Sequence, residues 1–361
     1  MKIRIIILIV FIILAIACVL LYAGRKVNVD TNKNVEGLSK ELQEVFYLAA
    51  LSPSSHNIQS WIINVYPEKD TVEIKVDPGR KLSVVDPEGR EMYISLGCYT
   101  ETLTRAFEAY GYQCRAEYDF FDRKMVVTYK KSSDTVYNEA IALIKKRHTE
   151  KAPFERDKIV PDDFMRAAIG DDDICYYRSG STEFDKIRED TSKAYEEQAY
   201  ETDAATELSM WLRLSDKEAK ETKDGLPAEQ LGIRGVKKAL YYLFTNHESV
   251  TGDSFAKQGI DNTEKQLDGC NCFVVIPSAE DEEGLIDCGK ETVRFWLQMT
   301  ERGISVQPMS YALEDAEMKD LLKKDLNLSA APQMLLRVGY VSNYGENACI
   351  RRDLKDYVRV R

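Results

Sequence analysis

Two glycine-bounded stretches of equal length, far apart in the chain, constrain the fold more than any other feature. Gly97 to Gly111 and Gly289 to Gly303 both span 14 positions. At helical spacing within them, three positions of the first stretch align with three of the second: Thr100, Leu103 and Phe107 with Thr292, Phe295 and Met299. Two unrelated amphipathic helices, each ending at a glycine cap, would also give this pattern. We favour an internal repeat, which predicts a chain of two similar halves.

The N-terminus predicts a membrane helix. Ile5 to Gly24 are 20 consecutive residues without a charge, long enough at about 1.5 Å per residue to cross a bilayer core of about 30 Å. A cleaved signal peptide is the main alternative, and the residues before Cys18 faintly resemble a lipoprotein cleavage site. We expect an uncleaved anchor, because the apolar run continues past Cys18 and is longer than the core of a typical signal peptide.

The side of the membrane on which the remaining chain lies stays open. Two basic residues flank each end of the apolar run, and the amino terminus gives the N-terminal side a slight excess of positive charge, which favours an extracytoplasmic body. Seven cysteines lie outside the anchor, an odd number, mostly beside apolar runs. They indicate buried reduced thiols, which favours a cytoplasmic body instead. Cys270 and Cys272 lack a second pair at matching spacing, so no metal site is expected.

Charge excludes one class of partner. Residues 1–26 hold four basic residues and no acidic one, which leaves 45 basic and 60 acidic residues, a net charge of −15, in the remainder. Such a body repels nucleic-acid backbones, so no nucleic-acid partner is expected. A phosphate site in this chain has to be a local basic pocket.

Two polar segments carry the candidate chemistry. Residues 52–61 read Ser-Pro-Ser-Ser-His-Asn-Ile-Gln-Ser-Trp, a turn rich in groups that can hydrogen-bond a flat heteroaromatic ring. Residues 146–154 read Lys-Arg-His-Thr-Glu-Lys-Ala-Pro-Phe, which concentrates donors suited to a phosphate. A ring site together with a phosphate site indicates a nucleotide or a flavin as the ligand.

These segments resemble two motifs of the nitroreductase superfamily, Ser-Pro-Ser-x-x-Asn-x-Gln-Pro-Trp and Lys-Arg-His-Ser-x-Lys-x-Phe. Ser60 departs from the family's proline. The motif order is the reverse of that in ordinary nitroreductases, which favours the two-halved, single-chain Acg branch; residues 86–97 are similar to a stretch of that branch. Residues 331–340 resemble the family's closing strand. The resemblance covers roughly residues 40–355 and is weakest over 155–265.

The resemblance implies an α+β, nitroreductase-like fold: a central, mostly antiparallel sheet flanked by helices, two pseudo-symmetric halves in one chain, and an N-terminal transmembrane helix. The expected parts are an anchor (1–26), a linker (27–40), a first half (41–133) and a second half (134–361). Residues 223–262 with the aromatic cluster 241–244 form either a lid over a flat ligand or a helix packed on the core. The pattern predicts helices over 41–51, 92–110, 134–148, 181–222, 289–301 and 314–325, and strands over 61–66, 71–77, 114–119, 124–129, 272–276 and 333–341.

The resemblance also assigns a site, with FMN as cofactor. The first half would contact the ring and the second half the phosphate; the implied residues are Pro53, Ser54, Ser55, Asn57, Arg147, His148, Thr149, Lys151, Arg351 and Arg352. In place of the family's Pro-x-Glu-Gly loop the chain has Pro308-Met309-Ser310-Tyr311, so Ser310 would lie beside the ring. Each half lacks one of the two motifs, which predicts one FMN per chain. No catalytic residue is assigned, because a flavin carries the chemistry itself.

The function implied is that of a membrane-anchored FMN-dependent oxidoreductase of nitroreductase type. Hydride would pass through flavin N5 to a small acceptor, with NAD(P)H as the family's usual donor. The alternative is an FMN-binding protein that sequesters the flavin with little or no turnover. The expected partners are a small-molecule substrate and the lipid bilayer around residues 5–24. A monomer is expected, because the usual dimer interface lies within one chain.

Overall fold

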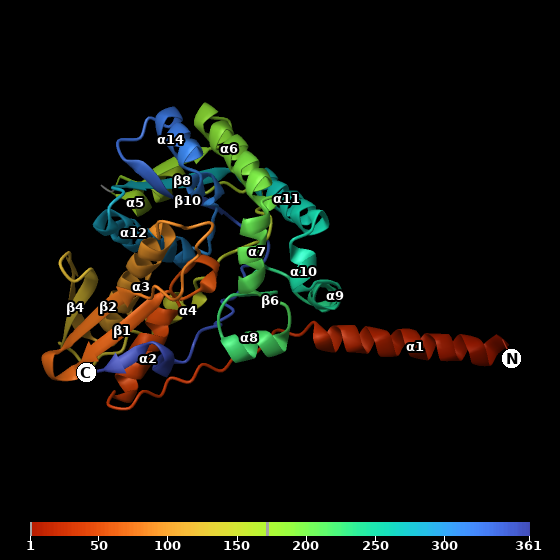
Figure 1. Cartoon of the computed structure of the whole chain (residues 1–361), viewed down its shortest axis with the longest axis horizontal. Coiled ribbons are helices and arrows are strands. Elements are labelled where there is room, and N and C mark those ends of the chain that lie inside the picture. Colours follow the sequence, from red (N-terminus) through yellow and green to blue (C-terminus); the bar gives the residue numbers. More distant parts are fainter. Residues whose placement is uncertain (1, 171–172) are drawn as a thin grey trace.

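The computed structural model describes residues 2–170 and 173–361 (Figure 1). The acidic stretch 171–173, which the sequence predicts to be a solvated loop, lies outside the described residues apart from Asp173. Helix α1, Lys2–Ala23, projects away from the body, and its segment Ile3–Ala23 is apolar and long enough to span a membrane. None of that segment is buried against the protein.

The first half contains a five-stranded sheet in the order β11-β1-β2-β4-β3. Its strands are β1 (Trp61–Tyr66), β2 (Thr71–Val76), β3 (Tyr112–Asp119), β4 (Lys124–Lys131) and β11 (Val358–Val360). Helices α2 (Lys40–Ala50) and α3 (Arg90–Ala109) accompany it, with the short turns η1 (Ser55–Asn57) and η2 (Pro67–Lys69). The four strands of the first half are antiparallel, and β11 from the C-terminus pairs parallel to β1.

The second half contains a four-stranded antiparallel sheet in the order β5-β8-β10-β9. Its strands are β5 (Cys175–Arg178), β8 (Cys272–Ser278), β9 (Ser305–Pro308) and β10 (Ala331–Gly339). Around it lie α5 (Asp162–Ile169), α12 (Glu282–Glu301), α13 (Tyr311–Glu314) and α14 (Ala316–Asp325). Helix α4 (Asn138–Lys146) packs against α3 and α12, and the C-terminal turn η3 (Leu354–Asp356) packs against α2 and β11 of the first half.

The two halves repeat one pattern, which confirms the pseudo-symmetry predicted from the sequence. In the first sheet β1 pairs with β2, the 20-residue helix α3 follows β2, and the next strand, β3, lies at the sheet edge. In the second sheet β5 pairs with β8, the 20-residue helix α12 follows β8, and the next strand, β9, lies at the sheet edge. The repeat spacing therefore predicted the two central helices correctly. The α+β class is also confirmed, with one open sheet per half rather than a single sheet.

The pseudo-symmetric helices cross at the two glycines that open the repeat. A Cβ on Gly97 would lie 2.8 Å from the carbonyl carbon of Ile286, and a Cβ on Gly289 would lie 2.8 Å from the amide nitrogen of Cys98. A Cβ on Gly97 would also meet the carbonyl oxygen of Ile286, three residues before Gly289. A Cβ on Gly289 would meet the carbonyl oxygen of Ile94, three residues before Gly97. This reciprocal contact has the form of a two-fold interface, contained here within one chain.

Burial differs between the sheets for a physical reason. In β1 buried and half-buried residues alternate, as expected where one face is covered by helices and the other faces solvent. In β8 and β10 almost every residue is buried. Alternate residues of β8 join two cores: Val274 packs with Trp296 of α12, and Phe273 packs with Phe184 beyond the opposite face. The second sheet is thus covered on both faces.

A long insertion separates β5 from β8. It comprises α6 (Thr182–Ala199), α7 (Thr202–Trp211), β6 (Leu212–Arg213), α8 (Asp216–Thr222), β7 (Leu226–Pro227), α9 (Val236–Phe244), α10 (His247–Val250) and α11 (Asp253–Asp268). Figure 1 shows it along the side of the body from which α1 projects. The continuous helix predicted over 181–222 is broken at Tyr200–Glu201 and by β6, which pairs with β7 through Leu212 and Leu226.

The segment predicted as a linker packs on the body instead. Val27 and Val29 are buried in a small cluster with Ala219 and Ile350. The backbone amide of Val27 donates to Glu229 Oε1 at 2.8 Å. Apolar and polar residues alternate along the segment, so its valines can pack on the body. This packing fixes the chain that follows α1 against the insertion.

Candidate functional site

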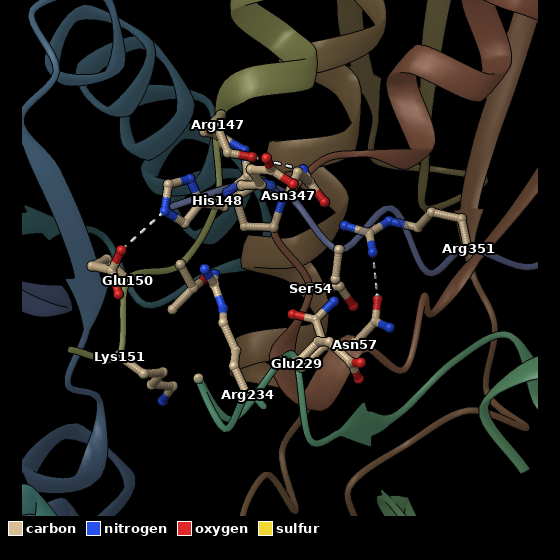
Figure 2. A pocket seen from close by; sticks show the side chains of 16 residues that line it. Ser54, Asn57, Arg147, His148, Glu150, Lys151, Glu229, Arg234, Asn347 and Arg351 are labelled. Atoms are coloured by element: carbon tan, nitrogen blue, oxygen red, sulfur yellow. Dashed lines mark hydrogen bonds and ion pairs between the residues drawn. The ribbon is translucent and has the colours of Figure 1, made fainter. Parts of the chain in front are cut away.

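A pocket forms where both halves, the insertion and the C-terminal segment meet (Figure 2). It brings together eight of the residues assigned from the sequence: Pro53, Ser54, Asn57, Arg147, His148, Thr149, Lys151 and Arg351. The structure adds eight that the sequence did not indicate: Glu150, Glu229, Gln230, Gly232, Arg234, Glu346, Asn347 and Ala348. The two distant motifs therefore lie in one site.

The turn of the first motif is strained and held from three sides. His56, Asn57 and Gln59 have φ values of 43°, 53° and 54°, in the left-handed region that non-glycine residues rarely adopt. Asn57 donates to the carbonyl oxygens of Gly225 and Ile350 at 3.0 and 3.2 Å and accepts from Arg351 at 3.0 Å. Its side-chain amide thus fixes the turn. Strain of this kind gathers at functional sites, where surrounding contacts maintain it.

The second motif lies in extended backbone rather than in a helix. Helix α4 ends at Lys146, whereas a helix over 134–148 was predicted, so Arg147 and His148 follow the helix. Arg337 of β10 holds this segment, donating to the carbonyl oxygens of Glu150 and Ala152 at 3.1 and 2.7 Å. The segment can therefore present successive side chains to the pocket.

Two buried guanidinium groups give the pocket its charge. Arg147 donates through Nη2 to the carbonyl oxygen of Leu51 at 2.6 Å, its Nη1 is buried without a partner, and its guanidinium lies 4.7 Å from the ring centre of Trp296. Arg351 donates to Asn57 Oδ1 and to backbone carbonyls, including that of Ser52 at 3.2 Å. Within the described part of the chain, neither guanidinium has a carboxylate partner within 4.0 Å.

Burial perturbs both groups. Burial lowers the pKa of Arg147 to about 10, and the charge of Arg351 acts in the same direction. Burial also lowers the pKa of Arg351 below its ordinary value. A buried charge without a counter-ion is costly. A chain of net charge −11 that keeps two such cations side by side has the donor set of an anion site.

The acidic residues of the pocket do not supply the missing counter-ion, because each has another partner. Glu150 Oε2 lies 3.2 Å from Nε2 of His148, Glu229 pairs with Lys238 at 2.6 Å, and Glu346 pairs with Lys26 at 2.9 Å. Burial and the charge of Arg337 lower the pKa of Lys151 to about 8. None of these three carboxylates therefore balances the buried positive charge of Arg147 and Arg351.

Three residues assigned from the resemblance do not line the pocket. Ser55 donates its hydroxyl to Glu91, and Ser310 precedes α13 beyond β9. Arg352 donates to the carbonyl oxygen of Gln59 at 2.9 Å and packs on Tyr357. Adjacent residues of an extended segment point to opposite sides, which explains why Arg351 enters the pocket and Arg352 does not.

Asn347 contributes a contact that the sequence did not indicate. Its Nδ2 donates to the carbonyl oxygen of Arg147 at 2.6 Å, and its Oδ1 accepts from the amide of Cys349 at 2.8 Å. It therefore links the C-terminal segment to the basic motif. It lies in irregular chain after β10, where no periodic pattern marks it.

A buried acidic group lies next to the turn. Glu91 accepts from the Ser55 hydroxyl and pairs with Arg90 at 3.1 Å. Glu314 of α13 accepts from Nε2 of Gln198 at 2.5 Å. Burial, together with the negative charge of Glu91, raises the pKa of Glu314 to about 8. A pKa raised this far favours the protonated carboxyl group near neutral pH.

The pocket is small as it stands. Its free volume is about 50 Å³, whereas sites that enclose a whole small molecule measure roughly 300–1,000 Å³. Residues 229–234 of the insertion close one side of it (Figure 2). A larger open groove of about 780 Å³ lies between α3, α4 and α12, and none of the residues assigned from the sequence lines it.

Comparison with known proteins supports one class, a nitroreductase-like oxidoreductase. No family model matches the chain. Over 320 residues it is 21% identical to the probable NAD(P)H nitroreductase PigM of a Serratia species, covering 82% of this chain and 88% of that relative. Over 315 residues it is 24% identical to the putative NAD(P)H nitroreductase Rv3131 of Mycobacterium tuberculosis, covering 84% and 86%.

Among solved structures, the chain is similar to the FMN-dependent nitroreductase NfnB of Mycobacterium smegmatis, crystallised with NADPH. That likeness has a TM-score of 0.37 at 18% identity and covers 62% of this chain and 97% of that one. The curated relatives confirm the resemblance to the nitroreductase superfamily over more than four fifths of the chain.

Proposed function

We propose that this chain is an FMN-dependent oxidoreductase of nitroreductase type, anchored in a membrane by α1. The observation that carries the proposal is the pair of buried cations, Arg147 and Arg351, which have no carboxylate partner in the described chain and lie where both motifs meet. The names of the curated relatives support the same activity. When bound, FMN would supply two-electron exchange between a reduced donor and a small acceptor.

The donor set fits the phosphate of FMN. Arg147 has a buried Nη1 without a partner, and Thr149 and Lys151 lie within four residues of it on the same extended segment. Arg351 adds positive charge, although its own donors are already used by the protein. Arg147 would therefore bind the phosphate directly, and Arg351 would stabilise the negative charge and the turn beside the ring.

The carboxyl group of Glu314 would hold a proton near the turn that contacts the ring. It lies close enough to Glu91 for that charge to raise its pKa, and Ser55 connects Glu91 to the strained turn. Reduction of most acceptors requires protons as well as electrons. A carboxyl group that is protonated near neutral pH and inside the protein can supply one.

A second function, sequestration of FMN, is favoured by the closed pocket. The free volume of about 50 Å³ requires residues 229–234 to move before a flavin can enter. Tyr311, one of the substitutions in the family's Pro-x-Glu-Gly loop, is packed against Tyr195 at a ring-centre distance of 4.4 Å. An anaerobic absorbance titration with NADPH tests the proposed activity. Bleaching that reverses on addition of an acceptor supports the oxidoreductase, and persistent flavin bands support either sequestration or a donor other than NADPH.

The anchor and its orientation belong to the proposal. Helix α1 has the length and composition of a membrane span. The slight excess of positive charge on its N-terminal side favours a body on the extracytoplasmic side. NAD(P)H is scarce there, so a body on that side would require a different reductant.

Glu314 gives the protein a specific pH dependence. Its folded-state pKa of about 8 lies above the ordinary value of 4.5, so between these values the folded chain holds a proton that the unfolded chain has released. Stability therefore falls as pH rises through this window, by roughly 1–3 kcal/mol from this group. Glu314→Gln is expected to remove that part of the loss, measured by urea unfolding at pH 5 and pH 8.

The matched control is Glu317→Gln, which makes the same change at an exposed position of α14. It is expected to leave the difference between pH 5 and pH 8 as it is in the unmodified chain. If both variants kept the full difference, the protonated state assigned to Glu314 would be wrong.

A further inference from the structure

Helix α9 presents apolar side chains to the outside and buries a lysine, the reverse of an ordinary surface helix. Its exposed residues include Val236, Leu240, Leu243 and Phe244, which recur at intervals of three and four and so form one apolar face. Leu243 is 67% exposed and Phe244 is 75% exposed. On the side toward the body, Lys238 is fully buried. A helix that hides a lysine and presents leucine and phenylalanine to the outside is built for an apolar environment.

The buried lysine fixes α9 to the end of the membrane helix. Lys238 Nζ pairs with Glu229 and Asp216, each at 2.6 Å, and donates to the carbonyl oxygen of Arg25 at 2.8 Å. Arg25 is the second residue after α1. The charge of Lys238 is therefore used to hold the helix in place, which leaves the apolar face turned outward.

A backbone contact sets the depth of α9. Gly24, directly after α1, has no room for a side chain, because a Cβ there would lie 3.0 Å from Cα of Gly235, the residue before α9. If Ile5 to Gly24 cross the hydrocarbon core, Gly24 lies at its boundary. Figure 1 shows α9 at the margin of the body where α1 leaves it. The apolar face is thus at the level of the bilayer interface.

We infer that the apolar face of α9 rests in the membrane interface beside α1, so that the lipid bilayer is the partner that covers it. This rests on the proposed anchoring of α1. An interfacial helix inserts its apolar side chains just below the lipid headgroups while cationic groups stay at headgroup level. Arg25, Lys26 and Lys237 are exposed near this level and suit that position.

The bilayer contact bears on the pocket, because the same segment closes it. The chain before α9 supplies Glu229, Gln230, Gly232 and Arg234 to the pocket wall. Glu229 pairs with Lys238 of α9, so a buried ion pair links the pocket wall to the helix that carries the apolar face. Contact with lipid therefore holds the residues that close the pocket next to the membrane.

The test uses the full chain reconstituted in liposomes, with a tryptophan in place of Phe244. Brominated acyl chains quench tryptophan emission at short range, so Phe244→Trp is expected to lose at least about half of its added emission. The matched control is Phe121→Trp, 95% exposed at the tip of the β3–β4 hairpin, far from α1 in Figure 1. Its added emission is expected to be unchanged. Emission of the parent chain, with its three native tryptophans, is subtracted.

Flotation of the liposomes after a carbonate wash separates this inference from the anchor. Chain that floats, with the added emission quenched in Phe244→Trp and unquenched in Phe121→Trp, supports both. If the chain floats and the emission of Phe244→Trp is not quenched, the anchor stands and the α9 contact is wrong; blue-shifted, unquenched emission would instead indicate that a second copy covers the face. If the chain does not float, both the anchor and the α9 contact are wrong. Leu243→Trp repeats the measurement where Phe244→Trp fails to fold.

Discussion

Replacing Gly97 by alanine is expected to lower the free energy of unfolding by about 3 kcal/mol or more, because the added methyl group meets the backbone of Ile286 and not a movable side chain. Gly289→Ala is expected to have a comparable effect through the backbone of Ile94 and Cys98. Helices α3 and α12 would have to separate, and they join the two halves. Urea unfolding followed by circular dichroism measures the loss.

Gly252→Ala is the control for these substitutions. Its Cβ would lie 3.4 Å from the nearest atom, the carbonyl oxygen of Ser249, which is an ordinary contact. At the N-cap of α11 this exchange is expected to cost about 1 kcal/mol. Equal stability losses in Gly97→Ala and Gly252→Ala would contradict the close helix crossing.

The second large effect is expected at the pocket, where Arg147→Ala should weaken FMN binding by about 100-fold. The substitution removes the buried, unpartnered donor that we propose binds the phosphate, and a charge-assisted hydrogen bond of this kind contributes about 2–3 kcal/mol. Riboflavin lacks the phosphate, so its affinity is expected to stay within about threefold. Fluorescence titration of the full chain with each flavin measures both affinities.

Arg352→Ala is the matched control, since it removes the same chemical group one residue from Arg351. Arg352 donates to the carbonyl oxygen of Gln59 and does not line the pocket. FMN affinity is expected to change by less than about threefold. A loss of FMN affinity in Arg352→Ala with none in Arg147→Ala would reverse the assignment of the phosphate site.

The repeat and the local motifs could be predicted from the sequence because they depend on short-range patterns. The equal spacing after Gly97 and Gly289 reflects two helices with the same crossing point, and their apolar stripes gave the helices themselves. The polar turn at 52–57 and the basic segment at 147–151 were visible as concentrations of donors. Their meeting in one pocket followed from the family resemblance and not from the residues.

Other features depend on contacts between distant parts of the chain. The parallel pairing of Ile63 in β1 with Val358 at the C-terminus has no local signal. The same holds for the wall formed by Glu229 and Arg234, which belong to an insertion with no periodicity of its own. Asn57 looked free to bind a ring, whereas the folded chain uses its amide to hold the turn.

The polar linker expected over 27–40 packs on the body instead, for a related reason. Its few valines alternate with polar residues, which a local reading assigns to exposed chain. In the folded protein Val27 and Val29 pack in one cluster with Ile350, which lies near the opposite end of the chain. Burial of isolated apolar residues depends on which surface the fold brings beside them, and that surface is not encoded nearby in the sequence.

The most direct measurement is an anaerobic absorbance spectrum of the purified full chain supplied with FMN, recorded before and after adding a reduced nicotinamide and then an acceptor. We expect flavin bands that remain with the protein after gel filtration, bleach on reduction and return with the acceptor. A chain that stays colourless after incubation with excess FMN would contradict the central claim, because the uncompensated positive charge of Arg147 and Arg351 would then serve no flavin phosphate.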